Sequence, residues 1–367
     1  IHGCMKLAII TDTHWGARND SQFFTEYFVK FYEDIFFPTL MERDIRTVVH
    51  MGDIVDRRKF INYKTLYQMR HHFFDQCWDR YISLHMIIGN HDTFFKNTNE
   101  VNSMDCLRMM MNGDEGDGGG MVRIYHDPTE VVFDGTKVFF QPWICPENKE
   151  QSLDAISNTD AQILFGHLEV QGFEMHLGAI NHEGLSPKVF EKFEYAFSGH
   201  FHHKSDNGNV YYLGNPYQIT WSDYKDPRGF HIFDTETREL EFILNPYEMF
   251  HKIYYDEERD WTSLEKIQEA DYSQYEGCYV KVVVVNRKNH FWFDTLMDKL
   301  YKANVADISV AENFDLDDLE GEEIIDEAED TITILSKYVQ SLEIENKNEL
   351  DSLMKSLYNE SLTMETI

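Results

Sequence analysis

Five short polar segments, spread over nearly two hundred residues, constrain the fold of this chain more than any other feature. Most of them directly follow an apolar, β-branched run, so each is expected where a β-strand ends. The segments are Asp12-Thr13-His14, Gly52-Asp53-Ile54-Val55-Asp56, Gly89-Asn90-His91-Asp92, Gly166-His167 and Gly199-His200-Phe201-His202. Strand ends are rigid, and side chains there can converge from distant parts of the sequence. The spacing therefore predicts strand ends that gather Asp, Asn and His side chains at one place.

These side chains form the mixed carboxylate, amide and imidazole donor set that suits first-row divalent metals. A two-metal site needs one bridging carboxylate and about three further ligands for each ion. Asp53, in the middle of the set, is the expected bridge. The expected ligands are Asp12, His14 and His202 for one ion, and Asn90, His167 and His200 for the other. A lone His is usually a core or surface residue, but seven Asp, Asn and His side chains at strand ends indicate a two-metal hydrolase.

Two further polar residues, His91 and Asp56, lie beside the expected ligands in the sequence. An imidazole next to two cations is neutral unless a carboxylate supports its protonated form. We hypothesise that Asp56 orients His91, and that His91 stabilises a phosphoryl transition state or protonates the leaving oxygen. The alternative role of Asp56 is to cap the turn that follows it.

Length and composition indicate one large domain with smaller attachments, because 367 residues with 42% apolar side chains can bury a sizeable core. No run of about 18 apolar residues is present, so we expect no membrane span. The five cysteines form no C-x-x-C pair, which predicts free thiols in a reducing cytoplasm. Residues 1–4, ahead of Met5, are expected to be a cloning remnant or upstream readthrough, outside the fold.

The net charge of −32 bears on the substrate, because proteins that bind nucleic acid are expected to be basic. Of the 65 acidic residues, 11 lie in residues 311–330, and two bound cations would reverse the sign of charge locally. Tight DNA binding would still need help from a basic partner. One compact basic patch stands out, and it is either a DNA contact or an ordinary solvated loop. It comprises Arg57, Arg58 and Lys59, with Lys96 after the Asn90-His91 turn.

The pattern of elements divides the chain into four parts after Met5. Residues 5–245 alternate strands and helices, and residues 246–310 form a small α/β unit. Residues 311–330 form an acidic linker, and residues 331–367 hold two amphipathic helices. These terminal helices are expected either to dock in a partner's groove or to fold back on their own domain. Long helices are also expected over residues 22–44, 63–81 and 99–111.

The five polar motifs resemble those of the calcineurin-like metallophosphoesterase superfamily. Two further segments are similar to the Mre-eleven/SbcD double-strand-break repair nucleases, above all to their tailed-phage recombination subunits. These segments are Gly214-Asn215-Pro216-Tyr217-Gln218 and Asp226-Pro227-Arg228-Gly229-Phe230. The resemblance implies an α/β fold, a β-sandwich flanked by helices, in residues 5–245. It also implies a DNA-recognising capping domain in residues 246–310 and a helical segment in residues 331–367 that binds a coiled-coil ABC ATPase.

By position, the resemblance carries the family's metal ligands onto the seven residues named above and its transition-state histidine onto His91. One departure is Asp56, where several cellular members have His; Ser/Thr protein phosphatases also carry Asp there. The resemblance further implies a homodimer. The Met-rich stretch Met104 to Met111 is similar to part of a dimer bundle, although plain core would look the same.

The function that the resemblance implies is DNA cleavage in the cytoplasm of a phage-infected host. Exonuclease action on duplex ends and endonuclease action on single strands would be gated by an SbcC-like ATPase. Two divalent ions are expected, with Mn²⁺ favoured and Mg²⁺ possible, because the donor set lacks a thiolate. The alternatives are a metallophosphatase acting on a phosphoprotein or small phosphoester, and a scaffold that has lost the chemistry.

Overall fold

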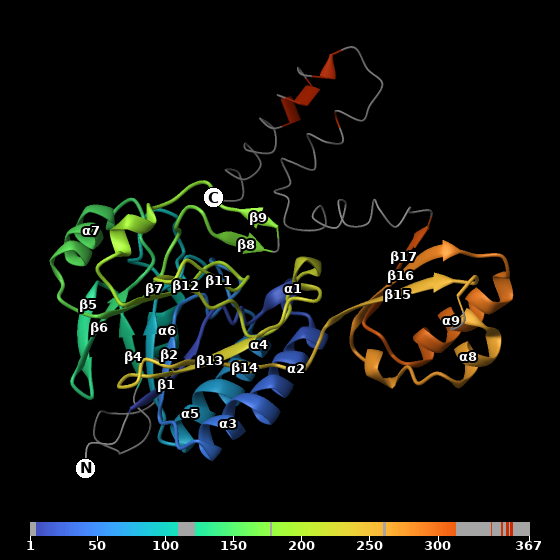
Figure 1. Cartoon of the computed structure of the whole chain (residues 1–367), viewed down its shortest axis with the longest axis horizontal. Helices are drawn as coiled ribbons and strands as arrows, with labels where there is room; N and C mark the ends of the chain where they lie inside the picture. The colour runs from blue at the N-terminus through green and yellow to red at the C-terminus, as the bar shows by residue number, and fades with distance from the viewer. Residues whose placement is uncertain are drawn as a thin grey trace.

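The structure is a computed structural model that describes residues 5–108, 122–176, 178–259 and 262–312, together with 339, 346–347, 350–351 and 353–354. Figure 1 shows a larger α/β body joined to a smaller α/β unit through the segment that leads into β15. The Met109–Met111 stretch, the acidic linker from residue 313 onward and most of the terminal helices lie outside the described residues.

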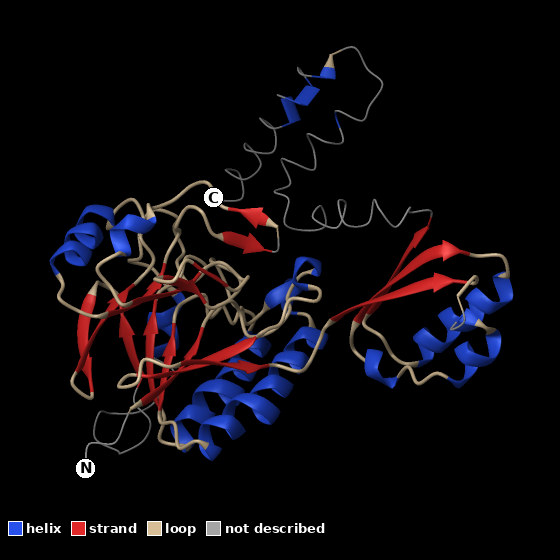
Figure 2. Ribbon diagram, viewed as in Figure 1, coloured by secondary structure: helices blue, strands red, loops and turns tan. Residues whose placement is uncertain are grey.

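The larger body is built on two six-stranded sheets (Figure 2). The first sheet has the order β14-β13-β1-β2-β3-β4. Its strands are β1 (Lys6–Ile10), β2 (Thr47–His50), β3 (Ser83–Ile87), β4 (Val122–Tyr125), β13 (Gly229–Asp234) and β14 (Leu240–Leu244). The second sheet has the order β11-β12-β10-β7-β6-β5. Its strands are β5 (Thr129–Phe133), β6 (Thr136–Gln141), β7 (Ile163–His167), β10 (Tyr195–Gly199), β11 (Ser205–Asp206) and β12 (Val210–Tyr212).

Apolar side chains from both sheets share one core, which includes Ile9 and Val49 of the first sheet and Phe165 and Phe197 of the second. Two sheets that interdigitate side chains in this way form a β-sandwich. The expected sandwich is therefore confirmed. A short hairpin, β8 (Glu174–His176) and β9 (Ala179–Ile180), was not anticipated.

Helices cover the outer faces of the sandwich (Figure 2). The predicted helices over residues 22–44 and 63–81 are present, and each contains a π-helical stretch, Tyr32–Phe36 and Arg70–Phe74. The helix expected from residue 99 begins at Ser103, and α7 was missed in the sequence. The helices are α1 (Ala17–Asp20), α2 (Gln22–Phe31), α3 (Phe37–Glu42), α4 (Tyr63–Met69), α5 (Asp75–Asp79), α6 (Ser103–Arg108) and α7 (Lys149–Asn158). Aromatic side chains such as Phe28 and Phe73 pack against the first sheet and bury a large apolar area.

The small unit, defined here as residues 250–312, has its own three-stranded parallel sheet in the order β15-β16-β17. Its elements are β15 (Phe250–Asp256), α8 (Leu264–Glu269), β16 (Tyr279–Asn286), α9 (His290–Lys302) and β17 (Asp307–Glu312). The β-branched run of β16 packs against α9, and Val282 and Leu296 are fully buried. Asn289 caps α9 by accepting hydrogen bonds from the main-chain N–H groups of Phe291 and Trp292.

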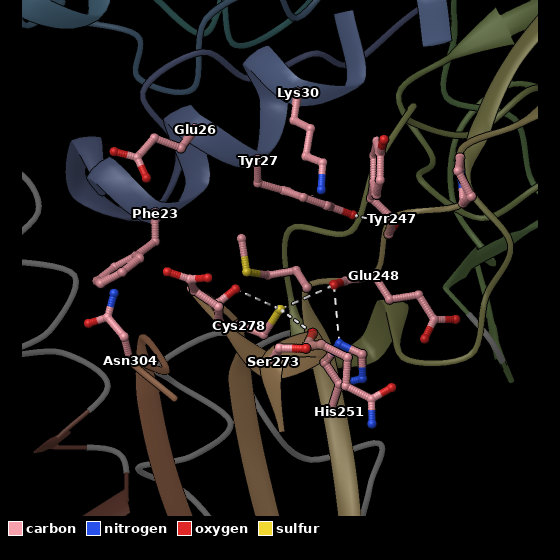
Figure 3. A pocket seen from close by; sticks show the side chains of 15 residues that line it. Phe23, Glu26, Tyr27, Lys30, Tyr247, Glu248, His251, Ser273, Cys278 and Asn304 are labelled. Atoms are coloured by element: carbon pink, nitrogen blue, oxygen red, sulfur yellow. Dashed lines mark hydrogen bonds between the residues drawn. The ribbon is translucent and has the colours of Figure 1, made fainter. Parts of the chain in front are cut away.

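The junction between the larger body and the small unit is hydrogen-bonded and partly open. Oε1 of Gln218 accepts hydrogen bonds from the main-chain N–H groups of Met249 (2.8 Å) and Phe250 (3.0 Å). The Tyr27 hydroxyl donates to the main-chain oxygen of Tyr247 (2.9 Å). Beside these contacts lies a cavity of about 660 Å³ (Figure 3). It is lined by α2, by the segment from Pro246 to His251, and by Ser273, Cys278 and Asn304 of the small unit with their neighbours. None of the side chains that line it belongs to the predicted metal site.

The direction of the strands places the polar motifs together. β1, β2 and β3 are parallel neighbours in the first sheet, and β7 and β10 are parallel neighbours in the second. Because carboxyl ends of parallel strands meet at one edge of a sheet, the five motifs emerge at the same end of the sandwich.

Among the described residues, no helix is long and apolar enough to cross a bilayer.

Candidate metal centre

The first group of predicted ligands meets at the ends of β1 and β10. Nε2 of His14 lies 3.0 Å from Nε2 of His202 and 3.9 Å from Oδ1 of Asp12. The loop after β10 is tied to the same carboxylate, because the main-chain N–H of His200 donates to Oδ2 of Asp12 (3.0 Å). Asp12, His14 and His202 thus form one compact cluster with metal-ligand spacing.

The second group meets at the ends of β2, β3, β7 and β10. Oδ1 of Asn90 lies 2.8 Å from Nε2 of His167 and 2.9 Å from Nδ1 of His200. Oδ2 of Asp53 lies 3.4 Å from Nε2 of His167 and 3.9 Å from Nε2 of His14. The Asp53 carboxylate therefore faces both groups, as a bridging ligand must. The structure brings all seven predicted ligands together.

The electrostatics of the site fit bound cations. Burial alone would raise the pKa of Asp53, but the His167 imidazole beside it contributes to a pKa well below the usual range. Burial would lower the pKa of His14, yet the neighbouring carboxylates, Asp56 first among them, raise it to about 9. The pKa of His167 is likewise raised to about 9, against burial, mainly by Asp53. At His200 the nearby carboxylate compensates less for burial, so burial lowers the pKa of this imidazole to about 3. The buried carboxylates require positive charge, which divalent ions supply more strongly than protons.

The ligand-bearing loops have strained backbones. Asp12, His14, Asp53 and His200 have φ values of 52°, 42°, 54° and 89°, in a region that non-glycine residues rarely adopt. Such strain persists only where the surrounding structure enforces it, and it clusters at functional sites. One glycine of the motifs is needed because the loop that carries it approaches Asp53 closely. A Cβ on Gly89 would lie 2.2 Å from Oδ1 of Asp53.

A buried carboxylate holds two of these loops together. Asp92 accepts hydrogen bonds from the main-chain N–H groups of Asp53 (2.7 Å), Ile54 (3.0 Å) and Gly89 (2.8 Å). It therefore joins the loop that carries the bridging carboxylate to the loop that carries Asn90. Sequence reasoning did not assign this role, although the place of Asp92 directly after Asn90-His91 could have suggested it.

A buried guanidinium holds the third loop. Arg228 donates to the main-chain oxygen of His202 and to Oδ1 of Asn215. Its other terminal nitrogen pairs with Asp223 (2.8 Å) and Asp226 (2.7 Å). Since Arg228 is 3% exposed, this network fixes the backbone of a predicted ligand from behind. Nothing in the spacing of the sequence indicates which loop this arginine contacts.

His91 and Asp56 are neighbours, but their contact differs from the expected one. Nδ1 of His91 donates to the main-chain oxygen of Asp56 (2.6 Å), not to its carboxylate. The Asp56 carboxylate instead lies 3.5 Å from Nδ1 of His14. The His91 and His14 rings meet edge to face, with centroids 4.9 Å apart. Asp56 therefore orients both rings, one through its backbone and the other through its side chain.

The predicted basic patch is divided between structural and exposed groups. Arg57 pairs with Asp20, and half-buried Arg58 donates to Oγ1 of Thr93 (3.1 Å). Burial lowers the pKa of the Arg58 guanidinium. Lys59 and Lys96 are exposed. The arginines thus contribute to the loop structure, and the lysines present charge to solvent.

Comparison with known proteins agrees with this geometry. The calcineurin-like phosphoesterase family profile matches residues 5–204. Exonuclease subunit 1 of Enterobacteria phage T4 is 30% identical over 340 residues, covering 92% of this chain and 93% of that protein. The SbcD component of the SbcCD nuclease of Staphylococcus epidermidis is 28% identical over 100 residues, covering 25% of this chain and 26% of that protein. A dimetal phosphatase from Danio rerio has a TM-score of 0.38 and 12% identity, covering 62% of this chain and 92% of that one.

The fold and the clustered donors define a metallophosphoesterase. The chain belongs to the calcineurin-like phosphoesterase family, whose members act with two divalent metal ions. Within that family it is similar over nearly its whole length to a phage exonuclease subunit.

Proposed function

We propose that this chain is a two-metal DNA nuclease, active on duplex ends and on single strands. The observation that carries the proposal is the convergence of two ligand groups on the shared carboxylate of Asp53, with His91 beside them. Similarity to a protein named as an exonuclease subunit, over 92% of the chain, supports DNA as the substrate. The proposed metal ligands are Asp12, His14, Asp53, Asn90, His167, His200 and His202.

Each site residue has a distinct role in the proposed reaction. Two bound divalent ions would stabilise the attacking and leaving oxygens of an in-line displacement at phosphorus. Nδ1–H of His91 is committed to the Asp56 oxygen, so His91 would act through Nε2. Nε2 must carry the second proton of an imidazolium to give a proton to the leaving oxygen or a hydrogen bond to the transition state. The Asp56 carboxylate orients His14. Mn²⁺ is the proposed ion, with Mg²⁺ as the alternative, because the donors are oxygen and imidazole without thiolate.

DNA is proposed to enter along the Arg57–Lys59 segment and Lys96. Lys59 and Lys96 would contact phosphates directly, and the two arginines would position the loop as well as add charge. The net charge of −32 disfavours unaided binding of a polyanion. We therefore propose an SbcC-like coiled-coil ABC ATPase as partner, bound through residues 331–367, and a homodimer that acts in the host cytoplasm. The small unit would form a cap over the DNA.

The proposal is tested by comparing two substrates. With Mn²⁺ and a co-purified ATPase, we expect nucleotide release from linear duplex DNA and none of the phosphate release from a phosphopeptide that a phosphatase would give. Faster hydrolysis of the phosphopeptide would establish the metallophosphatase alternative. Failure to hydrolyse either substrate, with or without the ATPase, would establish a scaffold.

A further inference from the structure

Three exposed phenylalanine rings surround the loops that carry the proposed catalytic histidine. Phe60 is 62% exposed, Phe95 is 47% exposed and Phe94 is 38% exposed. The rings of Phe94 and Phe95 form an edge-to-face pair with centroids 4.8 Å apart. The chain buries most of its phenylalanine side chains, and it gains no apolar burial by exposing these three.

The three rings lie on the two chain segments that follow Asp56 and His91. Phe94 follows His91 by three residues, which limits their Cα separation to roughly 10 Å. Arg58 joins the two loops, because its guanidinium donates to Oγ1 of Thr93 (3.1 Å) and to the main-chain oxygen of Phe95 (3.4 Å). Next to it, the Arg57 guanidinium lies 4.6 Å from the centre of the Phe60 ring. The segment that carries Phe60 and the loop that carries Phe94 and Phe95 are therefore tied together.

The charge around the rings has the opposite sign to that of the whole chain. Residues 57–74 contain five Lys or Arg and no Asp or Glu, in a chain with 65 acidic and 33 basic residues. Lys59 precedes Phe60 and Lys96 follows Phe95, and both are exposed. Alternating cations and aromatic rings suit a nucleic-acid strand whose phosphates pair with the cations while its bases stack on the rings.

We propose that Phe60, Phe94 and Phe95 form a stacking platform for unpaired bases beside the scissile phosphate. A paired base inside a duplex has both faces covered by its neighbours, so only an unpaired or terminal base can stack on these rings. The platform would thus make the site select frayed ends, overhangs and single strands over intact duplex. This inference rests on the proposed nuclease function and specifies the substrate within it.

A second copy of the chain fits the surface less well. A two-fold interface places the same patch on both partners, so the patch that carries Lys59 and Lys96 would meet an equally positive patch. Interface cores are also depleted of lysine. The positive charge instead complements a polyanion.

The test uses duplexes with 2-aminopurine in a 3′ overhang, in a 5′ overhang or at an internal paired position. Binding is measured in a His91→Gln background to suppress cleavage. We expect one overhang probe to be quenched on binding. The triple variant F60A/F94A/F95A should bind that overhang about 5- to 100-fold more weakly, as expected for lost base stacking, and should bind blunt duplex almost unchanged. The F60Y/F94Y/F95Y variant should restore quenching, because tyrosine also stacks.

The matched control is Tyr81→Ala, which removes a ring that is 68% exposed and lies just before β3, at the opposite end of that strand from Asn90-His91. It should leave overhang binding unchanged. Hydrolysis of methyl p-nitrophenyl phosphate is measured in protein that keeps His91, and it reports the metal centre alone. The triple alanine variant with His91 intact should retain this hydrolysis. If that hydrolysis is absent from the unaltered chain, the proposed function fails. If it is present and the triple variant binds the overhang normally, the platform fails. A triple variant that changes its sedimentation but keeps quenching would assign the surface to a second copy, which also overturns the proposal.

Discussion

Behind the ligands, Asp92 and Arg228 are buried and hold ligand-bearing loops through several hydrogen bonds each, whereas in front of them Lys59, Phe60 and Phe95 are exposed. The back of the centre determines where the ligands lie, because its donors reach the loop backbones. The front determines what can approach, because its rings and cations are exposed to solvent. Substitutions behind should therefore alter metal binding and every hydrolysis, and substitutions in front should alter only the binding of polymeric substrates.

The largest effect should come from Asp53→Asn, at the centre of both ligand groups. Losing the bridging charge removes both ions, so turnover should fall by at least about 10⁴-fold, the upper end for loss of a general acid alone. Calorimetric titration with Mn²⁺ should show no tight site. Retention of two tight sites would contradict the bridging role.

His91→Gln should separate chemistry from metal binding. Glutamine cannot exchange a proton, so turnover should fall by about 10²- to 10⁴-fold while the Mn²⁺ titration stays that of the unaltered chain. The measurement is single-turnover cleavage beside calorimetry. Loss of both ions would instead place His91 among the ligands.

The pH dependence of metal binding follows from His14 and His167, whose pKa values of about 9 exceed the ordinary 6.5. In metal-stripped protein, these protonated imidazoles stabilise the fold fully below pH 6.5, and that stability is lost as the pH rises through about 9. Mn²⁺ competes with the same protons and should bind about tenfold more tightly per pH unit for each proton displaced. Thermal shift assays from pH 7 to 9 should show a falling Tm without metal and a falling Mn²⁺ midpoint. A pH-independent midpoint would refute this coupling.

Arg228→Met tests the back of the centre. It leaves Asp223 and Asp226 buried without their cation, which should cost about 3–5 kcal/mol of unfolding free energy. Release of the His202 backbone should also weaken Mn²⁺ binding by about 10- to 100-fold. Arg228→Lys should recover part of the unfolding free energy and part of the Mn²⁺ affinity. The control is Arg43→Met, which breaks a surface ion pair with Glu241. Normal Mn²⁺ affinity in Arg228→Met would confine this arginine to stability.

The smallest effect should come from the front. Lys59→Gln with Lys96→Gln should weaken DNA binding several-fold and reduce the salt slope by about 0.7–0.9 for each lost phosphate contact. Hydrolysis of a small ester should not change. Lys6→Gln with Lys137→Gln, near the starts of β1 and β6 and so at the opposite strand ends from the ligands, is the matched control. An equal slope in both double variants would remove the lysines from the DNA path.

The resemblance to the metallophosphoesterases implies the sandwich. The sequence itself predicts the convergence of the seven ligands, because most motifs follow a β-branched run and all carry recognisable donors. The sequence predicts fewer of the side-chain contacts that depend on how separate loops pack against one another. The position of Asp56 did not reveal that its carbonyl, and not its carboxylate, contacts His91. Arg228 could not be linked to His202, because that contact depends on how two loops meet. β15 was missed because Lys252 and other polar residues interrupt its apolar pattern.

The exposed residues in front of the ligands show a second limit of prediction from sequence, which concerns the exposure of apolar side chains. Apolar residues in a loop are read as core from sequence alone, and only the fold reveals that Phe60 and Phe95 stay at the surface. Average composition alone would hide the basic segment, because the chain of 367 residues is strongly acidic, whereas the order of the residues shows the patch of Arg57, Arg58 and Lys59.

The most direct test is anomalous diffraction from crystals grown with excess Mn²⁺. Two peaks roughly 3.5–4 Å apart should flank the Asp53 carboxylate, one beside His14 and His202 and the other beside Asn90, His167 and His200. A map without peaks there, or with ions bound elsewhere, would contradict the account.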